Sequence, residues 1–286
     1  MALAALAAAC GTSGGGRSAD SCLYGTYSLG TRYAASFRER AAELRDLGGD
    51  FVVALETAHG ELDELPSGML AAPGCSLLAR SEWTVTAARR RLAELAGAFA
   101  NHPRVWGVCL GQEVDEFADH DRRAAMYRLA KSFFPAKRIF FYYARVPEDY
   151  GVGGEVESDV LFYELNPFDG SGNFDLARGI AKLERGLAVI DRTPGIPLWG
   201  QTSVNADHAY VTGPETMSRT WGATGENMVA EARELFSRTS PSGTKLEGLF
   251  WRSLGRFEWD LGYPAFAANR QRIREVASLE GRCSSP

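Results

Sequence analysis

The stretch His102-Pro-Arg-Val-Trp-Gly-Val-Cys-Leu-Gly-Gln-Glu-Val-Asp-Glu116 is the most informative part of this chain for its architecture. A helical pattern ends at Pro103, an apolar strand follows over 105–111, and carboxylates crowd the end of that strand. In a barrel of parallel strands, functional side chains lie at the C-terminal strand ends. The stretch therefore predicts a parallel strand and marks Glu113 as a candidate catalytic residue.

Short apolar runs with the character of strands recur along the rest of the chain. They cover 23–28, 51–56, 75–80, 105–111, 138–143, 159–164, 196–201 and 246–251. Helical patterns lie between most of them, at 34–47, 86–101, 122–134 and 174–191, and a last one covers 264–279. Strands that alternate with helices indicate a parallel sheet, because parallel strands need long crossover connections.

Eight such units in about 260 residues predict a single-domain (β/α)₈ barrel, the TIM barrel. The alternative is an open doubly wound sheet, which usually carries a Gly-rich phosphate loop after an early strand. Gly14-Gly15-Gly16 precedes every predicted strand and is better read as part of a tether. The barrel is therefore the preferred architecture.

Composition narrows the classes of partner. The chain has a formal net charge of −5, which argues against nucleic acid as the main partner, since phosphate backbones require clustered Lys and Arg. No apolar run approaches the roughly 20 residues needed to span a bilayer. No Cys/His cluster has zinc-ligand spacing, so we expect neither a metal nor a cofactor.

The N-terminal segment, residues 1–21, has the character of a leader and tether ahead of a barrel domain at 22–286. Small apolar residues run into Cys10, and a Gly/Ser stretch follows. This resembles a bacterial lipoprotein signal, which implies a lipidated Cys10 and an extracellular or cell-envelope location. The alternative is a disordered Ala/Gly-rich leader.

The chain contains five cysteines. Cys22 precedes the first predicted strand and Cys283 follows the last helix, and the first and last units of a barrel are neighbours. The two either form a disulfide that fastens the termini or are unrelated surface thiols. Cys75 and Cys109 lie in apolar runs and are expected to be small core residues.

The predicted strand ends carry carboxylates, amides, aromatic rings and arginines. We expect ligand contacts from Glu56, Arg80, Trp83, Gln112, Asp115, Tyr143, Asn166, Gln201, Trp251 and Arg252, beside Glu113 and Glu164. Carboxylates and amides hydrogen-bond sugar hydroxyls, and Trp and Tyr rings stack on sugar faces, so the set predicts a carbohydrate partner. The Trp rings are alternatively core residues. The arginines either pair with carboxylates or hold an anionic sugar.

Three segments resemble the TIM-barrel glycoside hydrolases. The stretch 102–116 is similar to their fourth-strand segment, Ser158–Phe168 to their sixth-strand segment, and Gly248–Trp251 to an eighth-strand run that ends in an aromatic residue. The resemblance implies that Glu113 is the catalytic acid/base. It also implies a second, nucleophilic Glu at the end of strand seven, where this chain has Gln201.

An amide cannot serve as a carboxylate nucleophile, which leaves three explanations. The second carboxylate comes from another strand, with Glu164 the first candidate and Glu56 the next. Alternatively, the neighbouring group of an N-acetyl sugar replaces it. The third possibility is a non-catalytic glycan-binding protein of the cell envelope. For Glu164, the alternative to a functional role is a salt bridge to Arg80 or Arg145.

Overall fold

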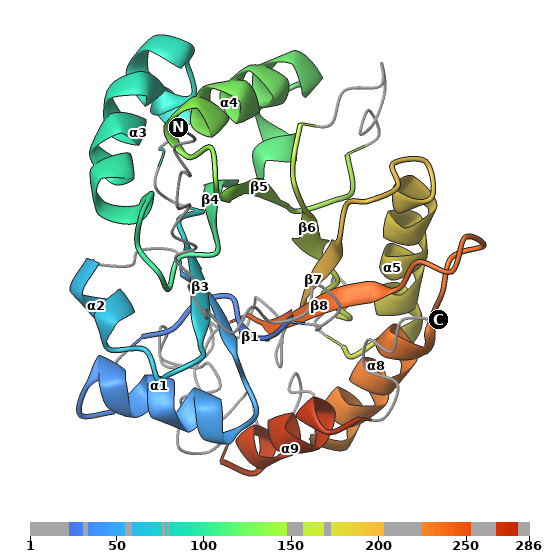
Figure 1. The fold of residues 1–286 in the computed structure, drawn as a ribbon. Coiled ribbons are helices and arrows are strands. Elements are labelled where there is room, and N and C mark those ends of the chain that lie inside the picture. Colours follow the sequence, from blue (N-terminus) through green and yellow to red (C-terminus); the bar gives the residue numbers. More distant parts are fainter. Residues whose placement is uncertain are drawn as a thin grey trace, which may run out of the picture.

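The computed structural model describes residues 23–30, 34–54, 59–75, 78, 80–147, 157–168, 173–202, 225–252 and 267–279. Within these residues, parallel strands form one eight-stranded sheet in the order β3-β2-β1-β8-β7-β6-β5-β4. Isolated bridges Ala71↔Val105 and Gly74↔Cys109 join the region of β3 to that of β4, so the sheet closes into a barrel. The predicted (β/α)₈ barrel is confirmed (Figure 1).

The strands are β1 (Leu23–Thr26), β2 (Phe51–Ala54), β3 (Leu70–Pro73), β4 (Gly107–Gln112), β5 (Arg138–Tyr143), β6 (Leu161–Glu164), β7 (Leu198–Thr202) and β8 (Leu246–Trp251). The α-helices are α1 (Phe37–Asp46), α2 (His59–Asp63), α3 (Val85–Phe99), α4 (His120–Phe133), α5 (Leu176–Ile190), α8 (Gly225–Ser237) and α9 (Ala267–Ala277). The helices surround the ring of strands (Figure 1). Short 3₁₀ turns lie at Arg80–Glu82 and Val114–Glu116.

Four of the helices begin at a polar cap that the sequence supplies. The side chains of Ser36, Thr84, Asp119 and Asp175 accept hydrogen bonds from backbone N–H groups in the first turns of α1, α3, α4 and α5. Each bond satisfies a donor that has no partner inside the helix. The caps explain why these helices begin within a few residues of the predicted positions.

Alternating side chains divide the core into two layers. The inner layer fills the barrel with aromatic rings, including Phe51, Phe140, Phe162, Trp199 and Phe250. The Trp199 ring centroid lies 5.3 Å from that of Phe140 and 5.1 Å from that of Phe250. The outer layer packs the opposite face of the strands against the helices. The interior is thus a packed core, which leaves the barrel mouth as the place to search for a functional site.

The third strand differs from its prediction. It was expected at 75–80, but β3 covers Leu70–Pro73, and Arg80 lies in a 3₁₀ turn. Pro73 ends the strand because proline cannot donate a ladder hydrogen bond. Cys75 then adopts a left-handed backbone with φ 64°. The helices α2 and α8 were not predicted.

The prediction for Cys75 and Cys109 was also incomplete. Both are buried as expected, but they form a disulfide with a Cα–Cα distance of 4.6 Å. Because the chain brings the end of β3 beside β4 only on barrel closure, their spacing in the sequence does not reveal the bond. Cys10, Cys22 and Cys283 lie outside the described residues, as does the predicted leader.

Candidate functional site at the barrel mouth

A β-bulge in β4 sets the direction of the side chains around Glu113. Cys109 pairs with Phe140 and Gln112 pairs with Tyr142, so three steps on β4 match two on β5. A bulge of this kind bends the strand and re-aims the residues that follow. Gln112 thereby stands opposite Tyr142, whose ring belongs to the inner layer.

Glu113 follows the bulge in the left-handed backbone conformation, with φ 53° and ψ 42°. This region is uncommon for residues other than glycine, and such outliers gather at functional sites. The Glu113 side chain is 35% exposed. Its carboxylate lies 3.4 Å from the Gln112 amide nitrogen and 4.0 Å from the Arg80 guanidinium. The backbone outlier marks Glu113 independently of the sequence motif.

Glu164 and Gln201 lie side by side at the ends of β6 and β7, where they form a register pair. The Tyr142 hydroxyl donates to Gln201 Oε1 at 2.6 Å and lies 3.4 Å from Glu164 Oε2. Gln201 Nε2 donates to the Thr202 carbonyl at 2.8 Å. The Gln201 amide is therefore fixed between β5 and β7, and Glu164 shares the Tyr142 hydroxyl with it.

Two tyrosines that the sequence analysis did not select form the floor of the site. The rings of Tyr27 and Tyr142 lie 4.8 Å apart, centroid to centroid. Burial raises the pKa of Tyr142, and the charges of Glu164 and Glu113 raise it further while Arg252 lowers it. Burial likewise raises the pKa of Tyr27, with Glu113 adding to the effect and Arg252 opposing it. Glu113 and Arg252 thus influence both phenols, and Glu164 contacts the Tyr142 hydroxyl.

Glu164 pairs with a cation, but with neither of the two partners considered from the sequence. Lys182 Nζ on α5 lies 3.5 Å from Glu164 Oε1. Burial lowers the pKa of Lys182, while the charge of Glu164 raises it. Arg80 instead pairs with Glu116 at 2.7 Å and lies over the Phe117 ring. The sequence of α5 does not predict the contact between Lys182 and Glu164, because α5 and β6 become neighbours only in the folded barrel.

Two polar residues of the predicted set organise loops. Asp115 accepts hydrogen bonds from the backbone N–H groups of Ala144 at 2.8 Å and Arg145 at 3.1 Å. Burial raises the pKa of Asp115, and these two hydrogen bonds oppose the shift. Asn166 Oδ1 accepts from the Phe168 N–H at 3.3 Å. Asp115 thereby ties the loop after β4 to the loop after β5 and positions the rim.

Three aromatic residues expected to touch a ligand lie in the outer layer instead. Trp83, Tyr143 and Trp251 are 0%, 0% and 1% exposed. Trp83 packs edge-on against Phe117. The Trp251 indole N–H donates to the Tyr24 hydroxyl at 2.6 Å. These rings have no surface for a sugar. The alternation of side chains along β5 and β8 turns Tyr143 and Trp251 toward the helices.

Glycine is required beside one of these rings. A Cβ on Gly111 would lie 2.3 Å from Trp83 Cζ2, which no side chain can accommodate without a shift. The bulged end of β4 therefore packs directly on Trp83, and Trp83 supports the site from behind. Of the other predicted residues, Arg252 follows β8, and Glu56 lies outside the described residues.

Within the described ranges, no group of three or more His, Cys, Asp or Glu side chains could hold a metal ion. The same residues contain no helix with the length and hydropathy to cross a bilayer.

Comparison with known proteins finds the same fold in several glycoside hydrolases. No family model and no curated protein matches the sequence. Among solved structures, a β-glucuronidase from Bifidobacterium dentium complexed with coumarin-3-O-glucuronide matches 91% of this chain with a TM-score of 0.64 and 12% identity. A GH2 β-galacturonidase from Eisenbergiella tayi bound to galacturonate matches 84% with a TM-score of 0.58 and 16% identity.

The β-glucuronidase from Dictyoglomus thermophilum matches 91% of the chain with a TM-score of 0.61 and 12% identity. The matched regions cover 46%, 47% and 51% of the Eisenbergiella, Bifidobacterium and Dictyoglomus proteins, so the chain spans about half the length of these relatives in structure. The chain therefore has the TIM-barrel fold found in glycoside hydrolases.

Proposed function

We propose that this protein is a glycoside hydrolase that acts on an oligosaccharide or polysaccharide by general acid/base catalysis. One observation carries the proposal: Glu113 directly follows β4 and Glu164 ends β6, so two carboxylates stand at the C-terminal ends of the barrel strands. Paired carboxylates across a cleft are the usual machinery of glycoside hydrolysis. The fold likeness to β-glucuronidases supports the same reaction class.

In this proposal the two carboxylates have different roles. Glu113 is the general acid that protonates the leaving oxygen, as its place after β4 implies. Glu164 is the second carboxylate, which must be ionised to act as base or nucleophile. At the end of β6, its two carboxylate oxygens face Lys182 Nζ and the Tyr142 hydroxyl. Gln112 and Arg252 orient the sugar.

Substitution of either carboxylate tests the mechanism. We expect Glu113→Gln and Glu164→Gln each to lower kcat by about 10²–10⁴-fold on a substrate found in a polysaccharide screen, because the amide cannot transfer a proton. Glu94→Gln, on the exposed face of α3, is the matched control and should retain full activity. Undiminished turnover by Glu113→Gln would overturn the assignment.

A second candidate function is glycan binding without hydrolysis, and Gln201 is the observation that favours it. The amide occupies the end of β7 and is fixed there by hydrogen bonds to Tyr142 and Thr202. Glycan binding by the wild-type protein with no turnover of any glycan in the screen would support this alternative.

We also propose that the protein acts outside the cytoplasm, tethered by a lipid on Cys10. The Cys75–Cys109 disulfide supports this location, since disulfides persist mainly in oxidising compartments. Labelling of expressing cells with a radioactive fatty acid tests the tether: we expect incorporation into the wild type and none into Cys10→Ser. Equal labelling of the two proteins would contradict it.

A further inference from the structure

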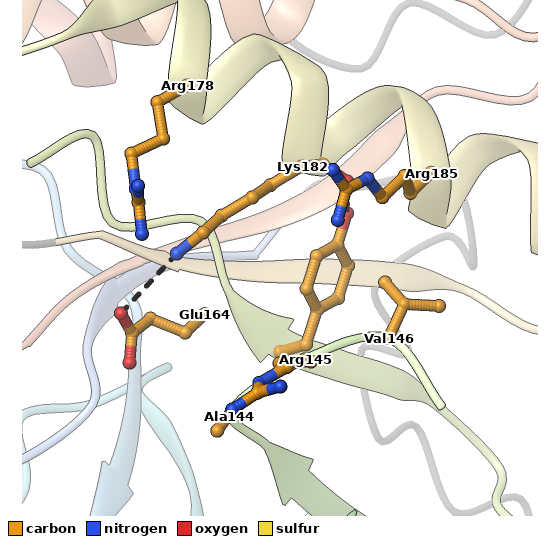
Figure 2. Close-up of a pocket in the computed structure, with 8 residues that line it drawn as sticks. Ala144, Arg145, Val146, Glu164, Arg178, Lys182 and Arg185 are labelled. Atoms are coloured by element: carbon orange, nitrogen blue, oxygen red, sulfur yellow. Dashed lines mark hydrogen bonds and ion pairs between the residues drawn. The ribbon is translucent and has the colours of Figure 1, made fainter. Parts of the chain in front are cut away.

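A basic cavity of about 300 Å³ lies beside the proposed catalytic position. Three structural elements form it: the loop after β5, the end of β6 and one face of α5 (Figure 2). Its lining residues are Ala144, Arg145, Val146, Tyr163, Glu164, Arg178, Lys182 and Arg185. The volume is at the lower end of the ~300–1,000 Å³ typical of small-molecule sites.

The cavity carries four cationic side chains and one carboxylate. Arg178, Lys182 and Arg185 follow one another at helical spacing, so they share one face of α5. Figure 2 shows Arg178 and Lys182 extending from that helix toward Glu164. Like charges at this spacing repel, and Arg178 and Arg185 both lower the pKa of Lys182. A bound anion would offset this repulsion between the cationic side chains.

Most of this positive charge has no partner in the described structure. Lys182 pairs with Glu164, whereas the guanidinium groups of Arg145, Arg178 and Arg185 make no ion pair with any described residue. All three arginines are exposed at the rim. A planar guanidinium binds carboxylate or sulfate oxygens in a bidentate manner. The rim is therefore suited to an anionic group.

Glu164 connects the cavity to the barrel mouth. Its Oε1 faces Lys182 at 3.5 Å, and its Oε2 faces Tyr142 at 3.4 Å. A group bound among the three arginines would thus lie on the opposite side of this carboxylate from Tyr27 and Tyr142. The Glu164 side chain therefore stands between the cavity and the barrel mouth, so a group in the cavity belongs to a sugar unit that adjoins the one at the mouth.

We infer that the Arg145/Arg178/Arg185 cavity is an anion subsite that binds the carboxylate or sulfate of a sugar unit adjoining the one at the barrel mouth. The substrate class is then an acidic oligosaccharide. This inference rests on the proposed function for the identity of the ligand as a glycan. The cavity is small and the chain has a net charge of −5, both of which disfavour a long polyanion such as nucleic acid.

Binding measured in the Glu113→Gln background tests the subsite without interference from turnover. The probes are trimeric to pentameric oligogalacturonates, oligoglucuronates and alginate oligomers, their neutral methyl esters, and sulfated galactan oligomers with their desulfated forms. Isothermal titration calorimetry should show at least one acidic probe binding tenfold or more tightly than its neutral counterpart. Carboxylated and sulfated probes distinguish the two sources of charge.

Two double variants locate the effect. Arg178→Gln/Arg185→Gln should weaken binding of the acidic probe about tenfold or more, because it removes two cationic hydrogen-bond donors from the cavity. Arg89→Gln/Arg90→Gln removes the same charge from the exposed face of α3 and should leave binding unchanged. Equal binding of acidic and neutral probes, or equal losses in both variants, would overturn the subsite.

The outcome is separable from that of the proposed function. Tight binding of an acidic probe that depends on Arg178 and Arg185, with no turnover by the wild type, supports the subsite and contradicts the hydrolase. Hydrolysis that requires Glu113 but shows no preference for acidic over neutral glycans supports the hydrolase and contradicts the subsite.

Discussion

At the scale of single residues, the Tyr142 hydroxyl organises the barrel mouth. It donates to Gln201 and contacts Glu164, and its ring lies tilted against that of Tyr27. The hydroxyl is buried, so the hydrogen bond to Gln201 forms where water does not compete. The neighbouring Tyr27 hydroxyl is equally buried and has no hydrogen-bond partner among the described residues. The two phenols therefore form a matched pair for measurement.

We expect Tyr142→Phe to lower the free energy of unfolding by about 1–2 kcal/mol, because a buried hydrogen bond to Gln201 is lost. Tyr27→Phe should leave the stability unchanged or slightly increased, since the hydroxyl it removes is unsatisfied. Urea unfolding of the two variants and the wild type measures both effects. Equal stabilities of the two variants would show that the Tyr142 bond contributes nothing.

One predicted site residue, Tyr143, is wrong by a single position. Tyr143 was expected in the site, but it belongs to the outer layer, and Tyr142 faces the barrel. Since side chains alternate along a strand, a prediction that is wrong by one residue names a side chain on the opposite face of the sheet. Phe140 and Tyr142 share a face with Gln112 only because of the β4 bulge. The apolar run 138–143 contains no local signal that fixes its inward face.

At the scale of elements, α8 is joined to the barrel by a buried polar contact. The Thr202 hydroxyl at the end of β7 donates to Glu231 Oε1 at 2.6 Å, and Glu231 is 0% exposed. Burial raises the pKa of Glu231 from 4.5 to about 8, and the hydrogen bond from Thr202 opposes the shift. The folded protein therefore favours the neutral acid at this position.

This shift makes the docking of α8 sensitive to pH. Because the pKa of Glu231 is raised on folding, its contribution to stability is complete below about pH 4.5 and is lost as the pH rises toward 8. We expect Glu231→Gln, which cannot ionise, to lose less stability than the wild type over this interval. Chemical denaturation at several pH values measures the difference, which should grow between pH 5 and pH 8.

Glu226→Gln provides the control for that experiment. Glu226 lies in the first turn of the same helix and is exposed. Its substitution should leave the slope of stability against pH as in the wild type. Parallel curves for the wild type and Glu231→Gln would contradict the assignment of the pH dependence to Glu231.

At the scale of the whole molecule, the seam between β3 and β4 is where the barrel closes. The other neighbouring strands pair at consecutive residues, whereas this seam has only the isolated bridges Ala71↔Val105 and Gly74↔Cys109 among the described residues. The Cys75–Cys109 disulfide crosses the same seam. A covalent bond thus joins the two neighbouring strands whose pairing lacks a continuous ladder.

We expect Cys75→Ala/Cys109→Ala to lower the free energy of unfolding by about 3–4 kcal/mol, as the unfolded chain regains the freedom of a loop with a sequence separation of 34 residues. Denaturation with and without dithiothreitol measures the effect: the wild type should lose a similar amount under reduction, and the double variant should not respond. A wild type that unfolds identically in both conditions would rule out a stabilising bond.

The alternation of strands and helices, the barrel and the position of Glu113 after a buried strand all follow from the amino-acid sequence. These features are local, since the hydrophobic periodicity, the helix caps and the proline before the strand each depend on residues that are close together in the sequence. Tertiary structure alone decided the bulge that aims Gln112, the inward face that selects Tyr142, the pairing of Lys182 with Glu164 and the disulfide at the seam. Each of these depends on the register between strands or on the approach of distant segments, which is fixed only when the barrel closes.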